Sequence, residues 1–212
     1  IPSWIEKRWI KNFGKENLIK SAEFFNQSPK IFLRYDGLQS LIKRKISSLE
    51  EEGIKTELFS PNFLKVTSGG SRVLASKLFK KGEISIQSPS AASVVDCLGV
   101  KEDDVVLDVC AAPGTKTLQL ANLLGDEGYL YASDISVERV RLGEKDEKRH
   151  RKKNIKWSSK DARKDSFYTA DKILIDAPCS GTGVMGRKPD IRWRRKESDL
   201  KKFASTQLSI LK

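Results

Sequence analysis

The stretch VVLDVCAAPGTKT, residues 105–117, decides the fold. It begins with the apolar run that is typical of a buried strand, passes through small residues, and leads into a helical pattern over 117–124. The alternation continues downstream, with further strands and helices predicted at 129–133, 137–149, 155–158, 173–175 and 197–211. Strands that alternate with helices at this spacing predict an α/β fold with a parallel, doubly wound sheet.

The residues before this stretch predict a smaller α+β unit. Two short helices are expected over 2–26, with Gly14 between them. Strands are expected at 31–34, 56–59 and 63–66, a helix at 38–52, and a connecting segment from residue 83 into a helix over 91–98. We therefore predict a helical lead-in over 1–28, an α+β domain over 29–82 and a larger α/β domain over 83–212.

The chain of 212 residues is strongly basic, with a formal net charge of +12 that favours a polyanionic partner. One basic cluster, KDEKRHRKK at 145–153, is expected to be the solvated end of a helix and includes the single histidine, His150. The second, RKPDIRWRRK at 187–196, has an aromatic residue among its cations. Because arginine holds phosphate and tryptophan stacks on bases, we predict that RNA contacts come from Arg187, Arg192, Trp193 and Arg194.

Cysteine and histidine usage argues against several classes of protein. The three cysteines, at 97, 110 and 179, form neither a CxxC pair nor a histidine cluster, so we expect no disulfide framework and no metal site. A Ser-His-Asp hydrolase would have to use His150, and nothing near it in sequence supports that role. No apolar run is long enough to span a bilayer and no signal-peptide pattern opens the chain, so we expect a cytoplasmic monomer.

Carboxylates follow each strand of the predicted parallel sheet. Ligands bind to such sheets outside the carboxyl ends of the strands, so one crevice is expected to be faced by Asp108, Asp134, Asp161 and Asp176. The small residues of the loop 110–115 let a ligand approach the backbone, and amides at the following helix start can bind an anion. Asp134 comes 20 residues after Gly114, where an acid commonly grips both ribose hydroxyls of a nucleotide-like cofactor.

The sequence of this loop, taken alone, leaves other interpretations open. A Walker A phosphate loop needs glycine at 110 and 115, a dinucleotide fingerprint needs three spaced glycines, and a tight turn needs no ligand. The octapeptide DAPCSGTG at 176–183 favours a reactive site. It joins an acid at a strand end to a proline, a cysteine and a glycine-rich turn, a costly arrangement if Cys179 were only a small buried hydrophobe.

Together these motifs resemble the NOL/NOP/Sun group of RNA cytosine-5 methyltransferases, and within it the bacterial Sun/Fmu-like 16S rRNA enzymes. DVCAAPGTKT at 108–117 is similar to the group's cofactor motif, and DAPCSGTG is similar to its substrate motif. RKPDIRW at 187–193, QSPS at 87–90 and the tryptophans near the N-terminus extend the resemblance over nearly the whole chain. It implies a Rossmann-like sheet that uses S-adenosylmethionine, incomplete at its C-terminal end, after a small RRM-like RNA-binding domain.

The resemblance also implies roles for individual residues. The methionine part of S-adenosylmethionine would be wrapped by Cys110, Ala111, Ala112, Pro113, Gly114, Thr115 and Lys116. Asp134 would bind the ribose and Asp161 would lie near the adenine. Asp176 would sit between cofactor and cytosine, at the N3 edge of the base, and Cys179 would assist product release. The expected catalytic set is Cys179, Asp176 and Lys116.

Carbon 5 of cytosine needs activation before it can accept a methyl group. A thiolate that adds to carbon 6 makes carbon 5 enamine-like, and the target base must be unstacked to admit the thiol. The resemblance places this thiolate in a later Thr-Cys motif, a role that none of the three cysteines here fills. We therefore expect the nucleophile beyond residue 212, in a longer protein of which these residues are a part.

Three functions are weighed. The first is cytosine-5 methylation of RNA, with ribosomal RNA preferred over transfer RNA. The second is an RNA-binding ribosome-assembly factor that lacks catalysis, which the absence of a downstream Thr-Cys pair would favour. The third is methylation of an adenine amino group, which would usually show Asn- or Asp-Pro-Pro-aromatic where this chain has Asp-Ala-Pro-Cys.

Overall fold

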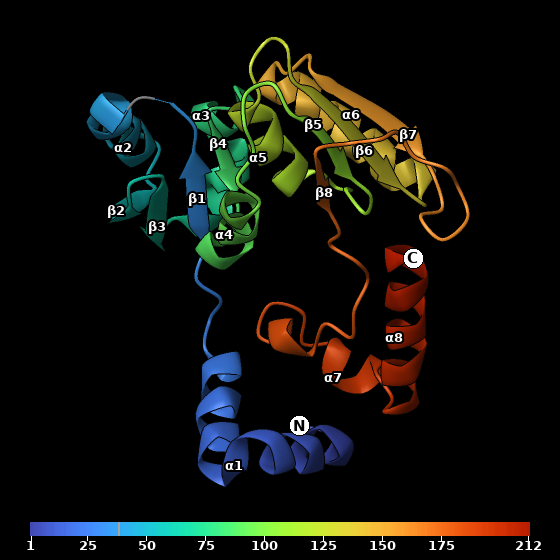
Figure 1. Cartoon of the computed structure of the whole chain (residues 1–212). Coiled ribbons are helices and arrows are strands. Elements are labelled where there is room, and N and C mark those ends of the chain that lie inside the picture. Colours follow the sequence, from blue (N-terminus) through green and yellow to red (C-terminus); the bar gives the residue numbers. More distant parts are fainter. Residues whose placement is uncertain (38) are drawn as a thin grey trace. The chain divides into compact units, whose positions relative to one another are not determined.

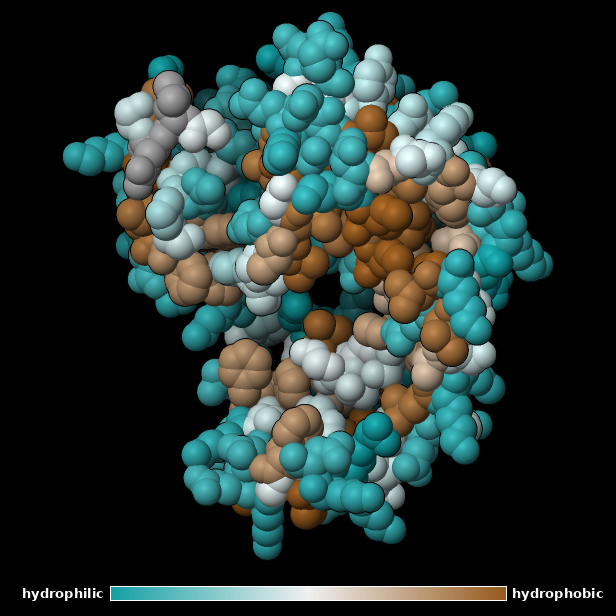
Figure 2. All heavy atoms as spheres, in the orientation of Figure 1, coloured by the Kyte–Doolittle hydropathy of each residue, from teal (hydrophilic) through white to brown (hydrophobic). Residues whose placement is uncertain are grey.

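The computed structural model describes residues 1–37 and 39–212 (Figure 1). The chain forms two compact units. The larger unit is Lys30–Asp176, and the smaller one joins Ile1–Pro29 to Ala177–Lys212. Hydrophilic residues cover much of the face shown in Figure 2, in keeping with the charged composition. In the part of the chain that the structure describes, none of the helices has the length and apolarity needed to cross a membrane.

The first sheet of the larger unit is antiparallel, with the strand order β2-β3-β1-β4. Its strands are β1 (Phe32–Tyr35), β2 (Lys55–Ser60), β3 (Phe63–Ser68) and β4 (Ile84–Ile86). The register places Leu33 opposite Leu64 on one side and Ile86 on the other. The three predicted strands are confirmed. The prediction of a plain connecting segment from residue 83 was wrong, because β4 pairs there with β1; a strand of three residues is too short to show a two-residue period.

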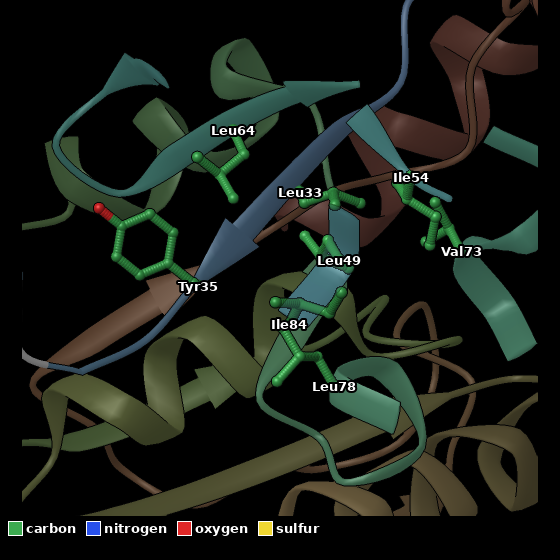
Figure 3. Packing of buried hydrophobic residues seen from close by; sticks show 8 residues of the cluster. All are labelled: Leu33, Tyr35, Leu49, Ile54, Leu64, Val73, Leu78 and Ile84. Atoms are coloured by element: carbon green, nitrogen blue, oxygen red, sulfur yellow. The ribbon is translucent and has the colours of Figure 1, made fainter. Parts of the chain in front are cut away.

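Short helices complete this part of the unit: η1 (Gln39–Leu41), α2 (Ile42–Glu51), η2 (Gly70–Ala75) and α3 (Lys77–Lys80). Leu38, where the predicted helix 38–52 begins, lies outside the described residues. One face of the sheet packs against α2 and α3 around a core formed by Leu33, Tyr35, Leu49, Ile54, Leu64, Val73, Leu78 and Ile84 (Figure 3). Burial of these apolar side chains is the main source of stability for the α+β part.

The second sheet is parallel throughout, with the order β7-β6-β5-β8. Its strands are β5 (Val105–Asp108), β6 (Tyr129–Asp134), β7 (Ile155–Ser159) and β8 (Lys172–Leu174), and its helices are α4 (Pro89–Cys97), α5 (Thr115–Leu123) and α6 (Val137–His150). This confirms the predicted Rossmann-like α/β fold. The order reverses at β5, which has β6 on one side and β8 on the other, so the topological switch point lies between β5 and β8.

The basic cluster at the end of α6 is exposed at Lys145, Lys148, Arg151 and Lys153, as predicted, but the prediction was wrong for Arg149 and His150, which contact the first sheet. The guanidinium carbon of Arg149 lies 3.9 Å from the centre of the Phe79 ring, and Arg149 donates to the Ile84 carbonyl oxygen at 3.3 Å. The Nε2 atom of His150 lies 3.2 Å from the hydroxyl of Ser85 in β4. Burial and the neighbouring Arg149 lower the pKa of His150 to about 4, so the ring stays neutral. This helix end therefore holds the two sheets of the unit together.

The smaller unit contains α1 (Ser3–Asn26), η3 (Thr182–Val184), α7 (Ile191–Arg194) and α8 (Ser198–Leu211). Helix α1 is broken at Gly14, whose φ of +81° and ψ of 162° are not helical, so the predicted pair of helices is confirmed as the two parts of α1. The core of this unit is small and is formed by Ile5, Met185 and Ile191, with Trp4, Trp9, Phe25 and Val184 packed around it.

Candidate active site

The loop 109–114 crosses the carboxyl ends of the parallel strands at the switch point. Its first amide, Val109 N, donates to the Leu174 carbonyl oxygen at the end of β8 (3.1 Å), and Ala111 N donates to the Ser133 carbonyl oxygen in β6 (2.8 Å). A cavity of about 120 Å³ lies here, lined by Asp108, residues 110–116 and Asp176. The structure thus brings the whole predicted methionine loop together with two of the four strand-end acids.

Two glycines let the loop and α6 approach the ring of Trp157. Gly114 has a φ of +105°, in the region that favours glycine, and a Cβ there would lie 3.0 Å from the Trp157 ring. A Cβ at Gly143 in α6 would lie 2.3 Å from the same ring. The indole N–H donates to Glu147 at 3.0 Å, which fixes the ring beneath the loop. Trp157 therefore packs against Gly114 and supports the start of α5.

Asp108 forms a buried wall of the cavity. Its Oδ2 accepts a hydrogen bond from the Thr117 hydroxyl at 2.8 Å, whereas its Oδ1 is buried without a hydrogen-bond partner among the described residues. Burial raises the pKa of Asp108 to about 7, with a further contribution from the charge of Asp176. A buried acceptor without a donor is costly, so this oxygen is suited to receive an N–H from a ligand in the cavity.

Lys116 and Asp176 close the other side of the cavity. The Lys116 ammonium lies 2.6 Å from a carboxylate oxygen of Asp176. This ion pair joins the first turn of α5 to the segment that follows β8. The lysine is mostly buried, and the aspartate is more than half exposed. The exposed carboxylate is available to a second ligand, and the lysine holds it in place.

Asp134, at the end of β6, contacts the loop at Ala112 and is only 3% exposed. Its carboxylate accepts hydrogen bonds from Ala112 N (3.2 Å), Ser136 N (3.1 Å) and the Arg139 guanidinium (3.3 Å). Arg139 also donates to the Ala112 carbonyl oxygen. Both oxygens of Asp134 are thus already in use, and together with Arg139 they tie the loop to β6 and α6.

Asp161 follows β7 but is not among the residues that line the cavity. Its carboxylate pairs with Arg163 at 2.6 Å and also accepts from the Arg163 backbone N–H at 3.0 Å. These contacts lower the pKa of Asp161 to about 2. Asp161 is therefore held ionised by contacts within the turn that follows β7.

The three cysteines lie in different surroundings. Cys110 is half-buried in the loop, and burial, followed by the charges of Asp134, Asp108 and Asp176, raises its pKa to about 11. It therefore stays a thiol near neutral pH. Cys97 ends α4 and Cys179 lies in the smaller unit, both exposed. Among the residues described, no group of three histidine, cysteine or acidic side chains is arranged to hold a metal ion.

The proline-cysteine turn is held within the smaller unit by two side chains. Arg195 donates through Nε to the Ser180 carbonyl oxygen at 3.1 Å, and Gln207 in α8 donates to the Pro178 carbonyl oxygen at 2.9 Å. The Arg195 guanidinium also lies 4.9 Å from the centre of the Phe203 ring. Cys179 is therefore presented on a turn whose backbone is fixed on both sides.

The predicted RNA-binding residues have unlike surroundings. Trp193 is 81% exposed, whereas Arg192 donates to the Phe25 carbonyl oxygen and to Asn26, each at 3.1 Å. Arg194 pairs with Asp190 at 3.0 Å, and Arg187 is exposed. Arg192 thus anchors the basic segment to the end of α1, and the other three present their side chains to solvent.

Sequence reasoning missed the roles of Thr117, Arg139 and Arg195. Thr117 belongs to the quoted motif, and its place one turn into α5 could have suggested a contact with Asp108. Arg139 lies in the first turn of the helix after β6, within reach of a strand-end acid. Arg195 was counted only as part of a basic cluster.

Comparisons with known proteins agree with this geometry. The model of the family described as 16S rRNA methyltransferase RsmB/F matches residues 95–212. The chain is 34% identical over 217 residues to the probable ribosomal RNA small subunit methyltransferase B of Bacillus subtilis, covering 100% of this chain and 48% of that protein. It is 32% identical to the ribosomal RNA small subunit methyltransferase B of Escherichia coli, covering 99% and 49%.

Two solved structures share the fold. A methyltransferase homologue from Pyrococcus horikoshii has a TM-score of 0.79 at 25% identity, covering 100% of this chain and 68% of its own. NSun6 from the same organism, solved with SFG, has a TM-score of 0.84 at 22% identity, covering 99% and 78%. The chain spans about half the length of the curated relatives it matches. Since the family model covers more than half of its residues, the chain belongs to the RsmB/F family of 16S rRNA methyltransferases.

Proposed function

We propose that this chain is the cofactor-binding and RNA-contacting core of an enzyme that methylates carbon 5 of a cytosine in small-subunit ribosomal RNA. The observation that carries the proposal is the cavity at the switch point, where a loop of small residues meets a buried carboxylate oxygen that lacks a donor among the described residues. The names of the relatives, which are small-subunit rRNA methyltransferases, support RNA as the substrate.

The residues of the cavity fit S-adenosylmethionine, which supplies an electrophilic methyl group on a sulfonium. Residues 110–116 would surround its methionine part, and Asp108 Oδ1 would accept one of its N–H groups. NSun6 from Pyrococcus horikoshii, which shares this fold, was solved with SFG. The charge of Asp176 is balanced by Lys116, so Asp108 decides the net charge of the cavity and favours a positively charged ligand once it is ionised, above about pH 7.

Asp134 remains our proposed ribose ligand, with one condition set by the structure. Because Asp134 is only 3% exposed and both of its oxygens already accept hydrogen bonds, a ribose hydroxyl would reach it once Arg139 moves aside. The Arg139 side chain is half-exposed and can move into solvent, and the ribose hydroxyl would then take its place on the buried Asp134 carboxylate. Ala112 N and Ser136 N would keep the carboxylate oriented during this exchange.

The chemical roles divide between the cavity and the proline-cysteine turn. Asp176, held by Lys116, would hold the cytosine at its N3 edge and, when protonated, donate to N3, which carries no hydrogen in the neutral base. Cys179 would assist release of the methylated base. Cys110 is not proposed as the attacking thiolate, because its raised pKa keeps it protonated. We assign the attack on carbon 6 to a cysteine outside these 212 residues.

The cofactor assignment is tested with Asp134→Ala. We expect at least a tenfold weaker affinity for S-adenosylmethionine by isothermal titration calorimetry, because the ribose ligand and the Ala112 N contact are both lost. Asp126→Ala, at an exposed acid in the turn before β6, is the matched control and should bind like the wild type. Equal affinity in all three proteins would refute the assignment.

The reaction is tested with the whole gene product and unmodified small-subunit rRNA. Mass spectrometry of the digested RNA should show 5-methylcytosine, and transfer RNA treated in parallel should show none. Asp176→Asn should slow the reaction about 100-fold while RNA still binds, because a neutral amide cannot serve as the acid-base group. Tight RNA binding without any methylated base would instead favour the assembly factor.

A further inference from the structure

A chain of buried polar side chains connects the first sheet to the start of α5. Arg34 in β1 is only 2% exposed, and its guanidinium donates to Gln87 Oε1 at 2.5 Å and to Asp36 Oδ2 at 3.1 Å. Gln87, buried just after β4, donates through Nε2 to Gln119 Oε1 at 2.9 Å. Arg34, Gln87 and Gln119 thus run from the antiparallel sheet to a helix of the parallel sheet without leaving the protein interior.

The far end of this chain is fixed to two helices. Gln119, buried in α5, donates to the Ala92 carbonyl oxygen at 3.1 Å and to Asp96 at 3.0 Å, both in α4. Arg34 also lies 3.5 Å from the Thr115 carbonyl oxygen, one turn before Gln119. Residues four apart lie on the same face of a helix, so the first turn of α5 is held from one side at two points.

The opposite side of the same segment has its own contacts. Asp134 and Arg139 hold both backbone groups of Ala112, and Asp108 holds the hydroxyl of Thr117. The chain from Arg34 is therefore a further support of the segment 112–119, and it comes from the first sheet, whereas these contacts come from the parallel sheet and α6. Buried polar groups that are paired resist movement, because a shift of α5 would leave Gln87 or Gln119 without a partner.

We propose that Arg34, Gln87 and Gln119 are positioning residues, through which the first sheet holds the cofactor loop in the form that binds the methyl donor. This inference rests on the proposed function for its ligand. It makes the small α+β part a structural determinant of donor affinity as well as an RNA-binding unit. By thermodynamic reciprocity, whatever binds that part and shifts β1 also changes the affinity for the donor.

Two substitutions at Gln87 test the proposal. Gln87→Leu removes both contacts and leaves the Arg34 charge short of an acceptor, so it should lower stability and donor affinity together. Gln87→Glu keeps an acceptor for Arg34 but cannot donate to Gln119. We expect it to fold with a melting temperature near that of the wild type and to bind S-adenosylmethionine at least tenfold more weakly by calorimetry.

The matched control is Val73→Ala, a substitution in the hydrophobic core of the same part of the unit, a cluster that contains none of the three residues. It should lower the melting temperature and leave donor affinity unchanged. If Gln87→Glu binds the donor like the wild type, or if Val73→Ala weakens binding equally, the positioning role is wrong. If the wild type itself binds no donor, the proposed function fails. Calorimetry then cannot test the positioning role, which is tested by hydrogen exchange.

Hydrogen exchange tests the positioning role of Gln87 in the protein without any ligand. In Gln87→Glu the amides of residues 118–123, which begin with the bond from Leu118 N to the Gly114 carbonyl oxygen, should exchange at least tenfold faster than in the wild type, since the lateral hold on α5 is lost. In Val73→Ala they should exchange as in the wild type, with faster exchange confined to the first sheet. Unchanged exchange over 118–123 in Gln87→Glu would overturn the proposal whatever the ligand.

Discussion

At the scale of single residues, the site depends on carboxylates that differ in charge state. Asp161 is held ionised by Arg163, whereas Asp108 is buried and has a pKa of about 7. Asp134 is satisfied by the protein itself. Four acids that look equivalent in sequence thus have different tasks, because burial and neighbouring donors decide whether each is free to meet a ligand.

Asp108→Asn should remove a pH dependence from the stability of the chain. An unfolded aspartate loses its proton near pH 4, but folded Asp108 keeps it up to about pH 7. Between these values the folded state binds the extra proton, so the wild type loses stability relative to Asp108→Asn as the pH rises, and the difference levels off above about pH 7. Urea unfolding at several pH values measures it; parallel curves for the two proteins would contradict the raised pKa.

At the residue scale, sequence reasoning found the motif and missed how its members bond. Asp108, the loop 110–116 and Asp176 do meet at one cavity, because parallel strands end on one edge. The contact between Asp134 and Arg139 was missed, although Arg139 lies in the first turn of the helix after β6, because the sequence does not show that its side chain turns back towards the strand end. The same holds for Arg34, whose charge is typical of a surface residue and which is nevertheless buried.

At the scale of elements, the packing of α6 on β7 is set by one glycine and one tryptophan. The Trp157 ring fills the space in which a side chain at Gly143 would lie. The indole is in turn hydrogen-bonded to Glu147, one turn further along the same helix. The separation of α6 from the sheet therefore cannot increase without loss of this bond.

Gly143→Ala should lower the free energy of unfolding by about 1–3 kcal/mol, the usual cost of overpacking a filled core. This result opposes helix propensity, which favours alanine over glycine by about 1 kcal/mol. Gly183→Ala is the control: a Cβ there meets no atom of the structure within 4 Å, so the change should be within about 0.5 kcal/mol of the wild type. Urea denaturation decides, and a stabilised Gly143→Ala would contradict the close packing.

Prediction of the elements succeeded where the pattern was long. The apolar runs of β5 and β6 and the periodic faces of α6 and α8 were predicted to within a few residues. The strand β4 and the four-residue helices α3 and α7 were not, because elements of three or four residues complete no hydrophobic period. The burial of His150 was also missed, since it depends on contacts with a strand 65 residues earlier.

At the scale of the whole molecule, positive charge is concentrated in the smaller unit. Residues 1–29 and 177–212 contain 14 lysines and arginines against six acids, a net charge of +8 out of +12 for the chain. The same unit presents the exposed Trp193. A basic surface with an exposed indole suits single-stranded RNA, to which phosphate contacts and stacking contribute separately.

These two contributions should separate in binding experiments. Arg187→Ala and Arg194→Ala should weaken binding to single-stranded RNA and reduce the slope of log K against log salt by about 0.7 each, measured by filter binding from about 50 to 200 mM salt. Trp193→Ala should weaken binding by about 1–3 kcal/mol with the slope unchanged.

Arg141→Ala, at an exposed arginine of α6 outside both predicted RNA-binding segments, is the control and should bind like the wild type. A wild-type affinity that does not change with salt would rule out phosphate contact as the main source of binding. A change of slope in Trp193→Ala would show that the indole acts through electrostatics and not through stacking.

The position of Trp157 has an optical consequence. It is the single tryptophan of residues 30–176, since the other three are Trp4, Trp9 and Trp193, and its ring lies against Gly114 at the start of α5. With those three replaced by phenylalanine, the fluorescence emission of the chain comes from one indole beneath the loop. The protein thus carries its own spectroscopic probe. The wavelength and intensity of the Trp157 emission report on the site without any label.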